Sequence, residues 1–330
     1  MKNNSNNIEK VNRMNECSSD ELRSMGFRLL DWFSVVMQEE LTRIKSNMTN
    51  TLIPKQQQQQ HANTNNNDNN KNLPDCEESV SFMFYHFDID NNYKLIEDTI
   101  RKSKSKGADV VVLPEAWNTF YYPKNIEELA DVDGERSKEF LSNISKELDI
   151  NIVGGSVAVK EDGKIYNRNY NYDRNGKLLS EYDKIHLFSP AGEDKLFTSG
   201  NKYATFEMDG VKCAVVLCYD VRFVERTRKF ALDGIEILFI CASWATSRLN
   251  HWEALNRARA IENQIFVVGV NSTRYKDDSG GHSMIVDPLG DYIVEPYETT
   301  GVKTAEINMN QVKDVRKQMN IYNDRRADLY

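Results

Sequence analysis

The stretch DVVVLPE, residues 109–115, decides the fold class of this 330-residue chain. Its unbroken run of valines and leucine predicts a strand that is buried on both faces of a sheet. Pro114 ends the hydrogen-bonded ladder of that strand, and Glu115 follows at once. Ligand sites in α/β sheets collect at the carboxyl ends of strands, so this carboxylate lies where chemistry is expected. Taken alone, Glu115 is equally well explained as an exposed residue after a strand.

Strand and helix patterns alternate outward from this stretch, between residue 79 and the C-terminus. Alternating elements with inserted hairpins, such as the turn at residues 173–176, imply a mixed α/β sheet covered by helices. The expected strands are residues 81–87, 109–113, 151–159, 178–185, 211–217, 235–241, 265–270, 282–286 and 292–295. The expected helices are residues 91–106, 135–148, 224–232, 251–263 and one that starts at Met309.

The first 78 residues differ from the rest in composition. Apolar residues between Leu22 and Ile44 recur at three- and four-residue spacing, which predicts an amphipathic helix within an N-terminal extension, residues 1–48. Residues 49–78 are rich in glutamine and asparagine and predict a disordered linker, because so few apolar side chains cannot offset the entropy of ordering. The main domain is therefore expected at residues 79–330. The role of the helix stays open between docking, self-association and a dispensable extension.

The composition argues against several classes of protein. The formal net charge of −8 disfavours a nucleic-acid binder, which carries a clustered basic excess. No apolar run approaches the roughly 18 residues of a membrane span, and the polar N-terminus lacks the apolar core of a secretory signal. The five cysteines are scattered and odd in number, which does not fit a disulfide framework, and none has the spacing of a zinc site. We therefore expect a reduced, cytoplasmic protein with no membrane partner.

A cysteine stands where the predicted strand 211–217 meets the next helix, in the stretch LCYDVRF. At such a turn Cys218 lies near backbone N–H groups and a helix N-terminus, which favour a thiolate and can later hold an oxyanion. Cys213 and Cys241 lie inside predicted strands, so we expect both to be buried and inert. Cys218 is thus the candidate nucleophile.

A lysine at another strand end, Lys184 in YDKIHLF, is a candidate fixed positive charge, although a lysine alone is usually a solvated surface residue. A histidine base is the alternative, because His186, His251 and His282 all belong to the main domain. The cysteine signature of papain-like enzymes is absent, but a purely spatial Cys-His pair stays open. We interpret His251 as a capping or packing residue, because it opens a predicted helix.

The order Glu115, Lys184, Cys218 belongs to a wider pattern. From about residue 79 to the C-terminus the chain resembles the nitrilase or carbon-nitrogen hydrolase superfamily. The stretches that carry the resemblance are GADVVVLPEAW, GKLLSEYDKIHLF, CYDVRF, HWEALNRARAIENQIFVVGVN, GHSMIVDPLGD and DRRADLY. CYDVRF and DRRADLY are most similar to the omega-amidase and deaminated-glutathione amidase branches. Val224 departs from the usual proline or alanine, and strand 81–87 lacks a glutamine common in the family.

The resemblance implies an α/β fold, a four-layer αββα sandwich of the nitrilase type, carrying the N-terminal helical and disordered extension. It also implies a Glu-Lys-Cys triad that needs no metal or organic cofactor. The expected partners are a small-molecule amide substrate and a second copy of the chain, in a homodimer whose C-terminal tail lies across the interface.

The activity that the resemblance implies is that of a cysteine amidase, which hydrolyses the terminal amide of a small carboxylic acid through a thioester. Glu115 acts as base, and Lys184 with the backbone N–H of Tyr219 holds the oxyanion. Glu193 hydrogen-bonds Lys184 or shapes the pocket. Omega-amidase substrates such as 2-oxoglutaramate are favoured. Deaminated-glutathione amidase, N-carbamoyl-amine amidase and a catalytically idle interaction module are the alternatives.

Two further expectations concern side chains around this site. We interpret Asp220 and Arg222 as a buried ion pair that supports the turn rather than as catalysts. A carboxylate on the substrate requires a cationic or N–H-rich patch, for which Arg248 is the preferred candidate. The other candidates lie in nearby loops and are Trp244, Asn250 and Arg274.

Overall fold

The computed structural model describes residues 88–119, 123–272, 280–296 and 301–329. The predicted N-terminal helix, the linker, strand 81–87 and Arg274 all lie outside the described residues. All of the described residues belong to one unit of the chain, Leu73–Tyr330.

The first sheet contains six strands in the described residues, and its order is β1-β3-β5-β4-β2, with β6 paired to β5. The pairs β1–β3 and β2–β4 are parallel, whereas β5 runs antiparallel to β3, β4 and β6. The strands are β1 Val110–Val112, β2 Asp131–Val132, β3 Asn151–Val153, β4 Val157–Glu161, β5 Lys164–Tyr172 and β6 Leu178–Asp183.

The second sheet has the order β12-β11-β10-β9-β8-β7 within the described residues. Its three central strands β8, β9 and β10 are parallel, and antiparallel strands flank them on both sides. The strands are β7 Thr205–Met208, β8 Val211–Leu217, β9 Ile237–Ala242, β10 Phe266–Asn271, β11 Met284–Val286 and β12 Tyr292–Val294.

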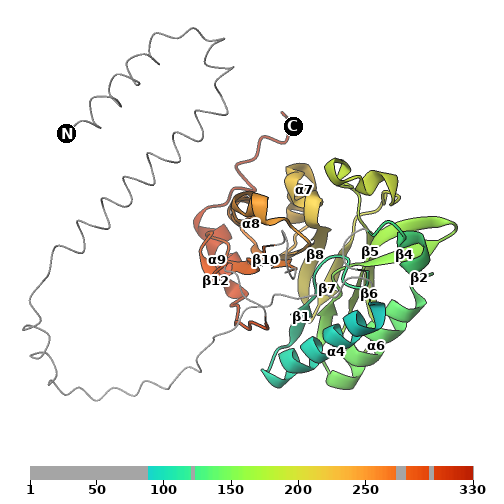
Figure 1. The fold of residues 1–330 in the computed structure, drawn as a ribbon. Helices are drawn as coiled ribbons and strands as arrows, with labels where there is room; N and C mark the ends of the chain where they lie inside the picture. Colours follow the sequence, from blue (N-terminus) through green and yellow to red (C-terminus); the bar gives the residue numbers. More distant parts are fainter. Residues whose placement is uncertain (1–87, 120–122, 273–279, 297–300, 330) are drawn as a thin grey trace, which may run out of the picture. The chain divides into compact units, whose positions relative to one another are not determined.

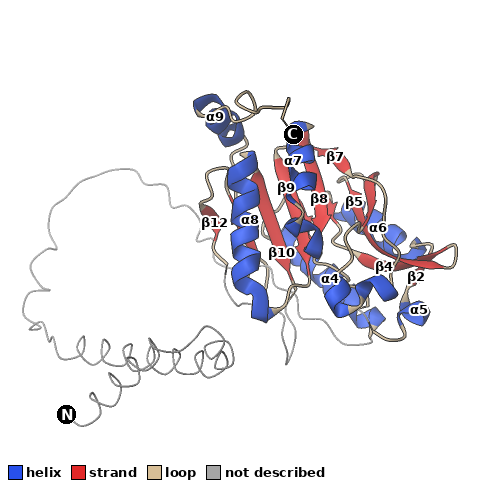
Figure 2. Ribbon diagram, turned by 90° about the horizontal axis from the view of Figure 1, so that it is seen from above, coloured by secondary structure: helices blue, strands red, loops and turns tan. Residues whose placement is uncertain are grey.

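Helices cover the outer faces of the two sheets (Figures 1 and 2). Helices α4 (Ile89–Ser105) and α6 (Glu135–Leu148) lie on the first sheet, and α7 (Val224–Leu232) and α8 (Leu249–Asn263) lie on the second. The short α5 (Ile126–Leu129) and α9 (Asn310–Gln318) complete the described helices. The four-layer sandwich expected from the sequence is confirmed.

Strand β8 shows how the sequence builds these layers. Its side chains alternate between faces because a strand has a period of two residues. Cys213, Val215 and Leu217 enter the core shared by the two sheets. Ala214 and Val216 face the core beneath α7 and α8. The apolar run is continuous because both faces are buried.

The prediction of one strand over residues 151–159 is wrong, because the chain bends between β3 and β4. Gly155 has a φ of +59°, which a glycine adopts without strain. A Cβ at Gly155 would lie 2.0 Å from the carbonyl oxygen of Pro114, so only glycine allows this approach. The backbone of Ser156 then donates to that same carbonyl at 3.1 Å. The bend therefore fixes the backbone immediately before Glu115.

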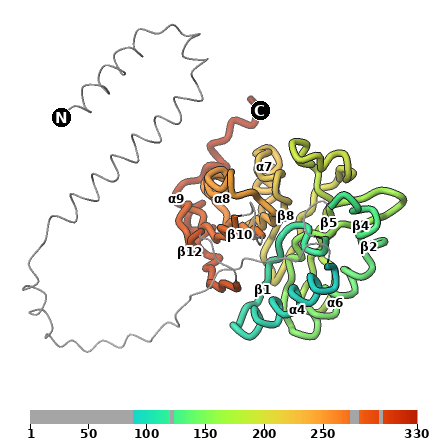
Figure 3. The backbone as a smooth tube through the Cα atoms, in the orientation of Figure 1, coloured from blue at the N-terminus to red at the C-terminus, as the bar shows by residue number. Residues whose placement is uncertain are grey.

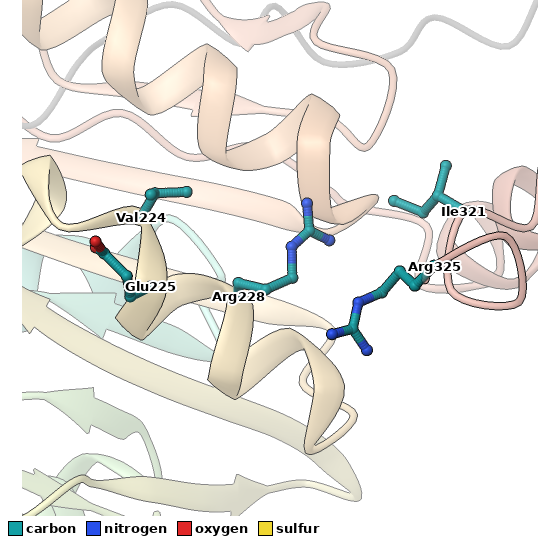
Figure 4. Close-up of a pocket in the computed structure, with 5 residues that line it drawn as sticks. All are labelled: Val224, Glu225, Arg228, Ile321 and Arg325. Atoms are coloured by element: carbon teal, nitrogen blue, oxygen red, sulfur yellow. The ribbon is translucent and has the colours of Figure 1, made fainter. Parts of the chain in front are cut away.

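The segment after α9 returns to the ends of α7 and α8 (Figure 3). Gln264 Nε2 donates to the carbonyl of Met319 at 2.7 Å, and the hydroxyl of Tyr322 donates to the carbonyl of Asn263. A cavity of about 340 Å³ lies between α7 and this segment, and Figure 4 shows the two arginines that line it, Arg228 on α7 and Arg325 on this segment. Its lining residues are Val224, Glu225, Arg228, Ile321 and Arg325. No described helix is both long and apolar enough to cross a membrane.

Candidate active site

Four strand ends bring polar groups to one place between the sheets. Glu115 follows β1, Lys184 follows β6, Cys218 follows β8 and Ser243 follows β9. Lys184 Nζ lies 2.8 Å from Glu115 Oε1 and 2.8 Å from Glu193 Oε2. The thiol of Cys218 lies close enough to Glu115, Lys184 and Glu193 for their charges to shift its pKa. The three residues predicted from sequence, with Glu193, are therefore neighbours.

Glu115 is held from both sheets. The backbone N–H of Ser243, in the second sheet, donates to Glu115 Oε2 at 2.9 Å. The amide of Asn167, in β5 of the first sheet, donates to Glu115 Oε1 at 3.0 Å. The next residue, Ala116, has a φ of +51°, and its N–H donates to the hydroxyl of Ser156 at 2.9 Å. These contacts fix both the backbone and the carboxylate of Glu115.

Lys184 is completely buried between two carboxylates. Burial by itself would lower the pKa of its ammonium, but Glu115 and Glu193 raise that pKa well above the ordinary value. Glu193 is held in turn by the backbone N–H of Phe188, which donates to Oε2 at 2.6 Å. Lys184 therefore supplies a permanent positive charge beside the thiol.

Cys218 occupies a tight turn between β8 and α7. Its φ of +44° is in the left-handed region, where a residue with a side chain is strained. Burial, followed by the charge of Glu115, raises the pKa of the thiol well above its ordinary value, although Lys184 acts in the opposite direction. Burial and the charge of Glu115 therefore oppose the thiolate that the sequence led us to expect at this turn. The thiol therefore needs a base to react.

Asp220 ties this turn to the loop that carries Lys184. Its carboxylate accepts hydrogen bonds from the N–H of Leu217 at 3.0 Å, the hydroxyl of Tyr182 at 2.7 Å and the N–H of His186 at 3.0 Å. Its ion-pair partner is Arg226, at 3.0 Å. Burial would raise the pKa of Asp220, but Arg226 and these hydrogen bonds hold it below the ordinary value.

The predicted Asp220–Arg222 ion pair is therefore wrong. Arg222 instead lies over the ring of Trp244, 4.8 Å from its centre, and contacts His251 Nδ1 at 3.2 Å. Arg226 is the partner because it lies on the buried face of α7, four residues before the fully buried Phe230. That spacing was the available signal in the sequence.

We expect Asp220→Asn to destabilise the fold by about 3 kcal/mol at neutral pH, because it leaves the buried Arg226 without its counter-charge. A carboxyl with a lowered pKa in the folded state stabilises above its unfolded pKa of about 3.9 and loses that stabilisation as the pH falls. The difference between the wild type and the variant should therefore shrink below about pH 4. Urea unfolding of both proteins from pH 7 to pH 3 measures it, and a difference that is constant with pH would contradict the assignment.

The three histidines have other partners. His186 Nδ1 lies 2.7 Å from Asp220 Oδ1, and its ring stacks on Phe223 with 3.6 Å between centres. His282 Nδ1 lies 2.7 Å from Glu253 Oε1. His251 is exposed within the first turn of α8, next to Arg222. These contacts favour a carboxylate over a histidine as the base that serves Cys218.

The described candidates for substrate binding lie close together around the start of α8. The guanidinium of Arg248 lies over the ring of Phe188, 5.3 Å from its centre, and Tyr219 meets the same ring edge-on at 5.0 Å. Trp244 is buried, and its indole N–H donates to the carbonyl of Arg248 at 2.8 Å. Asn250 is exposed and accepts a hydrogen bond from the N–H of His251.

Two residues of the site were missed in the sequence, Asn167 and Ser243. Ser243 contributes its backbone, so its side chain gave no signal. Asn167 does have a signal, because Asn167, Asn169 and Asn171 alternate along β5 and all are buried. Buried strand positions rarely carry amides unless the amides are hydrogen-bonded.

Comparison with known proteins places this arrangement in a family. The family model described as carbon-nitrogen hydrolase matches residues 75–317. A second model, the calcium-binding region of secreted protein acidic and rich in cysteine, matches residues 14–105, which is less than a third of the chain and mostly outside the described residues.

Individual relatives agree with the carbon-nitrogen hydrolase model. The chain is 42% identical to the 2-oxoglutaramate amidase of Bacillus subtilis over 241 residues, which cover 72% of this chain and 93% of that protein. It is 31% identical to the omega-amidase NIT2 of Homo sapiens, over 70% of this chain and 88% of that protein. The crystal structure of Saccharomyces cerevisiae Nit3, of the nitrilase superfamily, matches with a TM-score of 0.69 at 26% identity, covering 75% of this chain and 95% of that one. The chain belongs to the carbon-nitrogen hydrolase family of the nitrilase superfamily.

Proposed function

We propose that this protein is an omega-amidase-like cysteine hydrolase, which removes ammonia from the terminal amide of a small 2-oxo acid. The observation that supports this most is the group formed by Glu115, Lys184 and Cys218, in which a half-buried thiol lies beside a buried carboxylate and a buried ammonium. The relatives named 2-oxoglutaramate amidase and omega-amidase support the substrate class.

In the proposed cycle Glu115 takes the thiol proton while Cys218 Sγ attacks the amide carbon. The ammonium of Lys184 and the backbone N–H of Tyr219 hold the tetrahedral oxyanion. Glu115 then gives its proton to the leaving nitrogen, the C–N bond breaks, and ammonia departs from a thioester. Water attacks the thioester, Glu115 accepts its proton and returns it to the sulfur, and the carboxylic acid leaves. Glu193 keeps Lys184 in place at 2.8 Å.

The substrate carboxylate is assigned to Arg248. The guanidinium of Arg248 lies over the ring of Phe188. The backbone N–H of Phe188 donates to Glu193, so Phe188 connects Arg248 to the carboxylate that pairs with Lys184. Trp244 helps to position Arg248, because its indole N–H donates to the backbone carbonyl of Arg248. A carboxylate held there would leave the amide end of a short substrate to reach Cys218.

Arg248→Ala should raise KM for 2-oxoglutaramate about 10- to 100-fold and change kcat much less, because a charge-assisted hydrogen bond to the substrate is lost in both the ground state and the transition state. Arg248→Lys should recover part of the loss. The exposed neighbour supplies the matched control, Asn250→Ala, with a KM close to that of the wild type. Steady-state kinetics of the four proteins decide this, and an unchanged KM in Arg248→Ala would contradict the role.

Ammonia release from 2-oxoglutaramate, 2-oxosuccinamate, deaminated glutathione, glutamine and N-carbamoyl amines, measured side by side, tests the function. We expect the two 2-oxo acid amides to give the highest kcat/KM. A higher kcat/KM for deaminated glutathione or for an N-carbamoyl amine would identify the protein as an amidase of that substrate instead. Turnover of none of them would favour an interaction module.

We further propose that residues 79–330 form the catalytic domain, with residues 1–48 and 49–78 as extension and linker, since the family model begins at residue 75. A homodimer is proposed because apolar side chains on α7, α8 and the segment after α9 are exposed. These side chains are Leu232, Ile261 and Met319. A reducing, cytoplasmic location suits a catalytic thiol.

A further inference from the structure

Asn167 contacts both carboxylates of the site with a single nitrogen. Its Nδ2 lies 3.0 Å from Glu115 Oε1 and 3.2 Å from Glu193 Oε1. A side-chain NH₂ group carries two hydrogens, so one is available for each carboxylate. Both acceptors are carboxylate oxygens, which fixes the orientation of the amide with its NH₂ towards them. Asn167 is itself 1% exposed and comes from the middle of β5, a strand paired on both sides.

The two carboxylate oxygens of Glu115 have different hydrogen-bond donors. A carboxylate oxygen has two acceptor positions. Those of Oε1 are taken by Lys184 at 2.8 Å and Asn167 at 3.0 Å. Neither donor can accept a proton in return, because an ammonium and an amide NH₂ only donate. These two donors therefore direct a proton that Glu115 receives away from Oε1 and towards Oε2, whose described contacts include the backbone N–H of Ser243.

We propose that Asn167 is a positioning residue that fixes Oε2 of Glu115 as the oxygen that carries the proton during turnover. This rests on the proposed function, in which Glu115 moves a proton between Cys218, the leaving nitrogen and water. Lys184 alone would fill one acceptor position of Oε1 and leave the carboxyl able to hold its proton there. Asn167 fills the second position and holds Glu193 at the same time, so the carboxylates keep their places around Lys184 throughout the cycle.

A second buried asparagine provides a matched control. Asn171 lies on the same face of β5, is equally buried, and donates to Ser180 Oγ at 2.8 Å and to Asn169 Oδ1. Its contacts are with neighbouring strand residues rather than with the charged group. Replacement of Asn171 by leucine therefore repeats the loss of a buried amide from this strand without changing the hydrogen bonds of Glu115.

Asn167→Leu in the full-length chain should lower kcat for 2-oxoglutaramate about 10- to 100-fold, the effect of one lost hydrogen bond to a charged group, with KM within about threefold. Asn171→Leu should lower Tm while kcat stays within about threefold of the wild type. If leucine is not accommodated at position 167, Asn167→Ala gives the same test without added bulk. Equal losses of kcat in Asn167→Leu and Asn171→Leu, or a loss confined to KM, would overturn the proposal.

A second measurement does not need amidase activity. Alkylation of Cys218 by iodoacetamide, followed by peptide mass spectrometry, reports how readily Glu115 takes the thiol proton. Asn167→Leu should slow it about 10-fold in the wild-type background and have no effect in a Glu115→Gln background, because Asn167 acts through Glu115. Equal slowing in both backgrounds overturns the proposal. If this dependence on Glu115 is observed but no amide is turned over, the proposed function is overturned, whereas the action of Asn167 on the thiol through Glu115 is retained.

Discussion

Cys218→Ser is expected to lower kcat for 2-oxoglutaramate by at least about 10⁴-fold, the size of effect seen when a covalent nucleophile is removed from an enzyme. The reason is specific to this site. Glu115 must remove a proton whose loss the site already disfavours, since burial raises the pKa of the thiol well above its ordinary value. A serine hydroxyl holds its proton far more strongly than a thiol, so the same carboxylate cannot activate it.

The matched control for this substitution is Cys213→Ser. Cys213 lies in the same strand, β8, and is buried in the core between the sheets. It is buried as the sequence predicted, and burial raises the pKa of its thiol to about 12, which opposes formation of a thiolate. Initial rates of ammonia release compare the two variants. Near-normal turnover by Cys218→Ser would refute the nucleophile assignment.

Lys184→Met should affect both catalysis and stability. The loss of an oxyanion donor lowers kcat by about 10²–10³-fold. The loss of the cation between Glu115 and Glu193 leaves two buried carboxylates without their common counter-charge, which costs about 3–5 kcal/mol of unfolding free energy. Lys195→Met, at an exposed position beside Glu193, is the control and should change neither quantity appreciably.

The pH dependence of the unfolding free energy distinguishes loss of the Lys184 ion pairs from loss of side-chain packing. The pKa of Lys184 is raised in the folded state, so its stabilisation is complete below the unfolded pKa of about 10.4 and is lost as the pH rises through the folded value. The free-energy difference between the wild type and Lys184→Met should therefore persist through neutral pH and narrow only in strong alkali. Denaturant unfolding at several pH values checks this. A difference that disappears already at neutral pH would contradict the ion pair.

Much of the fold was predictable because its elements have strong local signals. Helices α6 and α7 and strand β8 have the predicted limits, since their apolar periodicity matches their burial. The bend at Gly155 was not predicted, because its cause is the close approach of Pro114, some forty residues earlier in the chain. The residues around Gly155 in the sequence do not indicate that Pro114 lies against it.

Some residues of the candidate site were likewise predictable from the sequence, and others were not. Glu115, Lys184 and Cys218 each follow a predicted strand, so the position of each along the chain indicated a shared edge. The partner of Asp220 was misassigned because Arg222 is nearer in sequence, whereas Arg226 is brought to it by the buried face of α7. The roles of Asn167 and the Ser243 backbone depend on contacts between separate strands, which only the folded chain shows.

Trapping of the thioester intermediate shows whether Cys218 is the nucleophile. The protein is mixed with 2-oxoglutaramate, quenched in acid within the first turnovers, digested and analysed by mass spectrometry. A thioester on Cys218 is stable to acid and should appear as the acyl mass on the peptide that contains residues 217–223, and it should be absent from Glu115→Gln. Ammonia released at the normal rate while that peptide stays unmodified at every quench time, or an acyl group on another residue, would contradict the account.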